Sequence, residues 1–162
     1  MRVIKDNQII EDSWTRVDSI TAEQPIPDGD VILPFKYWQQ NQDKLANHRG
    51  KLAVYLNGED KVEDLVKDLG RFELIALDFP AFRDGRCYSH ARLLRDRYGF
   101  KGDLRAIGDV LRDQLFYMKR CGFNSFFIRK DKDIEDALKA FNDFTVKYQT
   151  AADGALPVYR LR

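Results

Sequence analysis

Short apolar runs alternate with amphipathic stretches along most of the chain, and this alternation limits the fold more than any other feature. Residues 51–56, 73–79, 103–108 and 125–129 are short and apolar, which is typical of buried strands. Apolar residues at helical spacing lie between them, and residues 144–148 could form a fifth strand. Such βα units place helices against a mostly parallel sheet. We therefore predict an α/β fold with four to five strands, as an open sheet or a half-barrel-like array.

The predicted helices carry recognisable start and stop signals. Side-chain caps and an early proline favour helix starts, and glycine favours helix ends. The starts are Pro34, Asp60 with Glu63 as a capping-box partner, Asp109 and Asp133, and the ends are Gly70, Gly99 and Gly122.

Residues 1–33 differ from the rest of the chain in their pattern of apolar and turn-forming residues. Two pairs of apolar residues flank Asp6 and Asn7, which tolerate a positive φ, so a β-hairpin is predicted there. Two prolines and a glycine then predict an irregular connector. We expect 1–33 to form a β arm with its connector and 34–162 to form a single α/β domain, with an edge strand at 157–161.

The charges nearly cancel, with 27 Lys plus Arg against 26 Asp plus Glu. This balance argues against a general nucleic-acid binder, and no stretch approaches the roughly 18 apolar residues of a membrane helix. The first residues lack the apolar run of a signal peptide. Cys87 and Cys121 lack metal-ligand spacing and are interpreted as reduced thiols. We therefore expect a cytoplasmic protein with no metal, and we find no motif for a nucleotide, flavin, haem or iron–sulfur cofactor.

Candidate functional residues cluster where the predicted strands end, because ligands of open α/β sheets bind beyond the carboxyl ends of the strands. Arginine forks at such places suit small oxyanions. Seven cations and three acids lie between Arg83 and Arg105, so this stretch is locally basic. The strand predicted at 125–129 ends at Arg129, and the possible fifth strand ends near Tyr148. The candidates are Asp78 and Asp109 as acid or base, and Arg83, Asp84, Arg86, Arg105, Asp113 and Gln114 as ligand-binding residues.

Each candidate also has a plain structural explanation. Asp109 is equally suited to be an ordinary helix cap. The charges around Gly85 could form surface ion pairs, which contribute little individually. Asp78 closes a buried strand and needs a partner, for which Arg83 or Arg105 could serve.

Three segments, 78–89, 104–115 and 120–123, resemble a bacterial family known as domain of unknown function 934. Its members are often labelled as oxidoreductases of sulfite reduction, a label that follows from genes lying beside those of assimilatory sulfite reductase. The resemblance adds Tyr88 and Ser89 to the ligand-binding candidates. Cys87 departs from the family's pattern, which more often has glycine there. The residues carried over are Asp78, Arg83, Asp84, Gly85, Arg86, Tyr88, Ser89, Arg105, Gly108, Asp109, Asp113 and Gln114.

Three functions remain open at this point. The resemblance implies an accessory protein of sulfite assimilation that binds a small oxyanion, sulfite reductase or another sulfur-assimilation protein. The alternative is a small enzyme that uses Asp78 or Asp109 as acid or base on an anionic substrate. The third is an interaction module, in which the arm and the aromatics Trp14 and Trp38, taken as exposed, would join subunits of a homo-oligomer.

Overall fold

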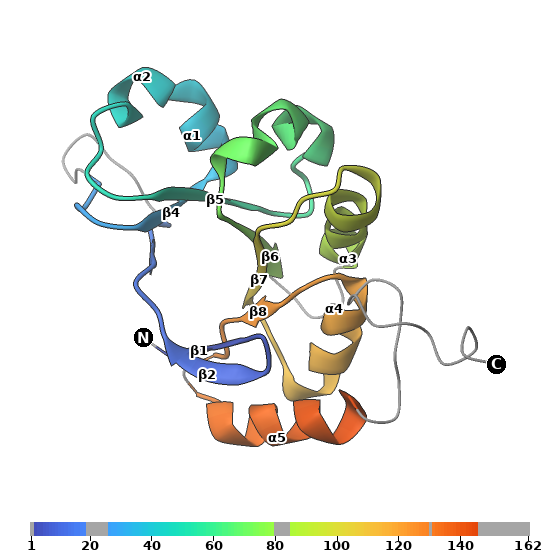
Figure 1. Ribbon diagram of the computed structural model, residues 1–162. Coiled ribbons are helices and arrows are strands. Elements are labelled where there is room, and N and C mark those ends of the chain that lie inside the picture. Colours follow the sequence, from blue (N-terminus) through green and yellow to red (C-terminus); the bar gives the residue numbers. More distant parts are fainter. Residues whose placement is uncertain (1, 19–25, 80–84, 130, 146–162) are drawn as a thin grey trace.

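The computed structural model describes residues 2–18, 26–79, 85–129 and 131–145, and the side chains of the last segment up to 141. It is an α/β structure with one mixed sheet of eight strands, flanked by helices (Figure 1). The strands are β1 (Arg2–Lys5), β2 (Gln8–Glu11), β3 (Thr15–Arg16), β4 (Val31–Pro34), β5 (Leu52–Leu56), β6 (Leu74–Phe79), β7 (Asp103–Gly108) and β8 (Ser125–Phe126).

The strand order is β2-β1-β8-β7-β6-β5-β4-β3. From β8 to β3 every neighbouring pair is parallel, whereas β1 runs antiparallel to both β2 and β8. The helices are α1 (Phe35–Gln40), α2 (Gln42–Leu45), the 3-10 helix η1 (Val62–Arg71), α3 (Arg86–Arg92), the π-helix η2 (Leu93–Arg97), the 3-10 helix η3 (Arg112–Gln114), α4 (Leu115–Cys121) and α5 (Ile134–Thr145).

A short connection forces this sheet to curl. Strands β2 and β3 are the two edges of the sheet, yet only residues 12–14 separate them along the chain. Eight flat strands would span about 34 Å, since neighbouring strands lie ~4.8 Å apart. The connection from Glu11 to Thr15 can reach at most about 15 Å. The sheet therefore curls into an open half-barrel, and the connection crosses its concave, helix-free face (Figure 1).

The two faces of the sheet bury different sets of side chains, because alternate residues of a strand point to opposite faces. On β6, Ile75 and Leu77 belong to the large core beneath the helices. Leu74 and Ala76 belong to a smaller cluster on the concave face, against which Trp14 packs. The helices thus cover the outside of the half-barrel, whereas no described helix covers its concave face.

The predicted α/β class and the N-terminal hairpin are confirmed, and Asp6 and Asn7 turn the hairpin with φ of 50° and 64°. The prediction of four to five mostly parallel strands was wrong, since the sheet has eight mixed strands. The hairpin joins the sheet beside β8. The two-residue β3 and the strand β4 also lie in the segment interpreted as arm and connector.

Two predicted helix caps were wrong. The Asp60 carboxylate accepts a hydrogen bond from the Asn57 amide at 2.9 Å, and η1 begins without a side-chain cap. Asp109 lies too far from η3 to cap it, because η3 begins at Arg112 after the extended Leu111, and no side chain caps η3 or α4. The Asp133 prediction is confirmed, because its carboxylate accepts from the amide of Glu135 at 2.9 Å.

The remaining predictions concern the exposure of Trp38, the strands expected after residue 143 and the absence of a membrane helix. Trp38 was wrongly taken as exposed: it is 3% exposed and packs against Phe72, with ring centroids 5.0 Å apart. Residues 144–145, predicted to begin a strand, end α5, and the rest of that strand and the edge strand at 157–161 lie outside the described residues. No helix in the described segments is long and apolar enough to cross a membrane.

Candidate functional site

A buried arginine occupies the middle of the concave face. Arg105 on β7 is 3% exposed, and its Nη1 and Nη2 each donate to a carboxylate oxygen of Asp12 at 2.7 Å. Its Nε donates to the hydroxyl of Ser125 at 2.9 Å. Charge-assisted bidentate pairs of this kind are among the stronger hydrogen bonds in proteins. Arg105 therefore holds the connection of residues 12–14, between β2 and β3, against the sheet. This role explains why a cation lies inside a strand.

Asp78 lies near the carboxyl end of β6, on the same face. Its partner is Arg16, whose Nη2 donates to Oδ2 of Asp78 at 3.3 Å. Arg16 also pairs with Asp18 and lies over the ring of Tyr55, 4.7 Å from its centroid. Burial raises the pKa of Asp78, and the neighbouring Arg16 opposes that rise. Half-buried carboxyls with a raised pKa are candidates for proton transfer.

Gly108 makes room for the Asp78 carboxylate. It ends β7 with a φ of 86°, a conformation that side-chain-bearing residues rarely adopt. A Cβ atom at this position would collide with Oδ1 of Asp78 and with the carbonyl oxygen of Phe79. Only glycine therefore fits between the carboxyl ends of these two strands.

A third arginine, Arg129, lies at the carboxyl ends of the parallel strands, beyond the ends of β7 and β8. Arg129 donates from Nη1 to Asp109 at 2.6 Å, and from Nε and Nη2 to Asp131 at 3.1 and 3.0 Å. Its side chain is 43% exposed and that of Asp131 is 56% exposed. The hydrogen bond to Asp109 raises the pKa of Arg129, which is thus a permanent cation. We call Asp109, Arg129 and Asp131 the rim triad.

The remaining predicted residues do not gather at one point. Arg86 and Ser89 are exposed on α3, Asp113 is exposed on η3, and Gln114 is partly buried there. Arg83 and Asp84 lie outside the described residues.

Tyr88 belongs to the helix layer, because its ring contacts Phe79 and Tyr117 at 5.0 and 4.9 Å between centroids. Burial raises its pKa to about 12, so the phenol stays protonated at neutral pH. The structure therefore separates Tyr88 from Asp78 by the thickness of the sheet.

Arg16 and Arg129 were not among the sequence candidates. Arg129 carried a usable signal, since it ends a predicted strand. Arg16 carried none, because its place beside Asp78 depends on the curl of the sheet and a separation of 62 residues.

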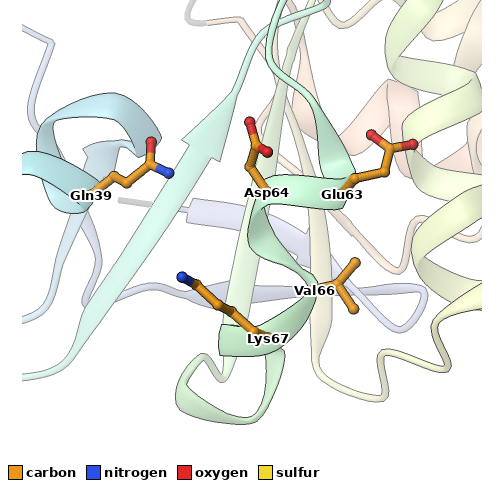
Figure 2. Close-up of a pocket in the computed structure, with 5 residues that line it drawn as sticks. All are labelled: Gln39, Glu63, Asp64, Val66 and Lys67. Atoms are coloured by element: carbon orange, nitrogen blue, oxygen red, sulfur yellow. The ribbon is translucent and has the colours of Figure 1, made fainter.

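One hollow borders Arg16 and Arg105, and another lies between two helices of the outer layer. The first is a cavity of about 50 Å³ on the concave face, which is large enough for a small apolar group. The other is an open cleft of about 440 Å³ between α1 and η1 (Figure 2). There Gln39 points toward Asp64, with Lys67 nearby, while Glu63 and Val66 project from the other side of η1. The cavity on the concave face is lined by Trp14, Arg16, Ile32, Arg105, Ile107 and Phe127.

The cleft of Figure 2 does not gather side chains of one charge, since it combines the acids Glu63 and Asp64 with Lys67. Glu63 also projects away from the others. Among the described residues, no group of three or more His, Cys, Asp or Glu side chains could hold a metal ion. The chemistry of the described site is therefore that of arginine–carboxylate pairs in two settings, buried on the concave face and exposed at the rim.

Comparisons with known proteins give one match. Residues 53–159 match the model of a family described as "Bacterial protein of unknown function (DUF934)". The match starts within β5 and includes β6, β7, β8 and the rim triad. No curated protein and no solved structure matches the chain.

Proposed function

We propose that this chain, which belongs to the DUF934 family of bacterial proteins, is a cytoplasmic accessory protein of assimilatory sulfite reduction. In this proposal the rim at the carboxyl ends of the strands recognises a small oxyanion or an anionic group of the reductase machinery. The rim triad carries the proposal, because it presents an arginine fork to solvent. The link to sulfite rests on the labels that the family's members carry.

The fork of Arg129 is built to exchange its partner. Its Nε and Nη2 hold the exposed Asp131 in a bidentate pair, which has the geometry of a fork on a sulfite or phosphate group. Exposed ion pairs contribute little to stability and are screened by salt. An incoming oxyanion can therefore replace Asp131 while Asp109 keeps the guanidinium in position.

Arg105 and Arg16 are less suited to the same exchange. Arg105 is buried against Asp12, so its release would leave a buried carboxylate unpaired. Arg16 is less exposed than Arg129, at 31% against 43%, and it is held by the partly buried Asp78 and by the ring of Tyr55. The anion site is therefore assigned to the rim and not to the concave face.

Calorimetric titration with sulfite, sulfate and phosphate tests this proposal, together with a pull-down using the purified assimilatory sulfite reductase. Arg129→Gln should weaken the observed binding at least tenfold. Arg112→Gln is the matched control, because Arg112 forms a comparably exposed ion pair with Asp136, at 2.9 Å, and does not belong to the rim triad. If the wild-type protein binds neither an anion nor the reductase, the proposal is wrong.

The raised pKa of Asp78 favours a second candidate function, a small enzyme in which this carboxyl moves a proton. Arg16 would then orient an anionic substrate as it exchanges Asp18 for the substrate. Asp78→Asn should abolish complementation of a deletion strain while leaving the thermal unfolding midpoint nearly unchanged. Asp109→Asn serves as the comparison at the other predicted acid. If Asp78→Asn fails to fold, Asp78 has a structural role and the second candidate function is wrong.

A further inference from the structure

The outer surface formed by α3 and α4 carries an exposed aromatic ring. Tyr117 on α4 is 47% exposed, and it is the one large hydrophobic side chain exposed within the described segments. It is held from below, since its ring meets Tyr88 edge-on and Tyr88 contacts Phe79 in the core. In Figure 1, α3 and α4 lie side by side on the outside of the sheet. The ring is therefore a fixed feature of the surface.

The same surface is basic. Neither α3 nor α4 contains an aspartate or a glutamate, whereas together they carry three arginines and a lysine. Within the described residues, Arg92 and Arg120 form no ion pair with a carboxylate. Arg92 lies beside Cys121 and opposes the rise that burial causes in the pKa of its thiol, and Arg120 lies over the ring of Phe116 at 5.8 Å. This distinguishes them from Arg16, Arg105 and Arg129, all of which hold carboxylates.

The helix dipole explains part of this arrangement. Arg120 lies in the last turn of α4, where the partial negative charge of the helix end favours a cation, whereas Arg92 lies where α3 continues directly into η2. The dipole gives no reason for the exposure of Tyr117 between them.

We infer that the α3–α4 surface, defined by Arg92, Tyr117 and Arg120, docks a protein partner through an acidic segment that carries an apolar side chain. The carboxylates would pair with the two guanidiniums, and the apolar side chain would pack on Tyr117. Tyrosine and arginine are the residues that dominate binding energy at protein interfaces. Complementary charge of this kind also selects the partner and speeds its approach. The inference rests on the proposed function only in naming the sulfite reductase machinery as the source of that segment.

The test uses the full ¹⁵N-labelled chain and a synthetic peptide of six glutamates around one phenylalanine. Amide shifts should concentrate on α3 and α4. Arg92→Glu/Arg120→Glu should weaken peptide binding at least tenfold, and Tyr117→Ala at least threefold, with recovery in Tyr117→Phe. Arg49→Glu/Arg97→Glu is the matched control, since it reverses two exposed arginines outside this surface and should change the affinity less than twofold. Circular dichroism verifies that each variant is folded.

The outcomes separate this inference from the proposed function. An equal loss in the control pair, shifts away from α3 and α4, or equally tight binding of an oligonucleotide of the same charge would each overturn the docking surface. The same variants are then tested on the purified reductase. If the reductase responds to Arg129→Gln and not to the α3–α4 variants, the rim proposal stands and this one is wrong. If the peptide result holds and the reductase does not bind, the docking surface stands with another partner.

Discussion

The molecule uses the same pair of side chains, an arginine fork on an aspartate, in two regions with opposite surroundings. On the concave face, Arg105 and Asp12 have side chains 3% and 5% exposed. At the rim, Arg129 and Asp131 are 43% and 56% exposed. Both forks are bidentate, with distances of 2.7 Å in the first pair and 3.0 to 3.1 Å in the second.

The comparison shows that burial, and not chemistry, decides what such a pair can do. Water cannot replace either partner of the buried pair, so breaking it leaves a charge stranded in a poorly solvated place. At the rim, water and salt compete for both partners. The buried pair thus acts as a fastener of the fold, and the exposed pair is available for exchange with a ligand.

The largest expected effect comes from breaking the buried pair. Arg105→Met should lower the free energy of unfolding by about 3–5 kcal/mol, because Asp12 would remain buried without its partner. Urea unfolding followed by circular dichroism measures the loss. The double variant Asp12→Leu/Arg105→Met should recover much of it, since neither charge is then left buried. A cost near zero for the single variant would contradict the fastening role.

The second largest effect on stability is expected at Gly108, which ends β7 beside Asp78. Gly108→Ala should cost about 1–3 kcal/mol, because alanine would be strained at this φ and its Cβ would meet Asp78 and Phe79. Gly99→Ala is the matched control: Gly99 also has a positive φ of 67°, with nothing within 4 Å of the added atom. The excess of the first loss over the second isolates the collision. Equal losses would mean that the strands yield without cost.

The third effect concerns the rim triad, where a substitution should change ligand binding and leave the free energy of unfolding unchanged. Arg129→Gln should leave the urea midpoint unchanged within error while it removes anion or reductase binding, because solvent screens this pair. Raising the salt concentration should likewise weaken ligand binding in the wild-type protein and leave the midpoint of unfolding in place. A clear drop in stability on Arg129→Gln would show that the rim pair is structural too.

The smallest effect is the pH dependence contributed by Asp78. Burial raises its pKa in the folded state above the ordinary value of 3.8. Between these two values the folded state binds more protons than the unfolded state, so this group lowers stability as the pH rises through that window. Asp78→Asn should remove this component from a plot of unfolding free energy against pH. An unchanged plot would show that Arg16 fully offsets the burial.

The sequence predicted the repeating βα part of the chain well, because local patterns determine it. The strand predicted at 103–108 coincides with β7, and Gly122 ends α4 in the left-handed conformation as expected. The hairpin at Asp6 and Asn7 was also a local signal. These features need only the few residues around them.

The missed features depend on contacts between distant residues. Strand β3 has two residues and exists only because β4 lies beside it. The partner of Asp78 was sought in Arg83 or Arg105, but Arg105 is taken by Asp12 from the other edge of the sheet. Asp109 looked like a helix cap because it precedes a helical pattern, whereas its carboxylate pairs with Arg129. No periodicity in the sequence encodes pairings across a curled sheet.

The antiparallel pairing of β1 with β8 has a consequence for the order of assembly. Ile4 lies opposite Phe126, so β1 pairs with a strand that is synthesised about 120 residues later. During translation the hairpin of β1 and β2 must wait with its apolar residues uncovered until β8 has emerged. We therefore expect closure of the half-barrel to be a late step of folding, with the edge of β1 available for mispairing before that step.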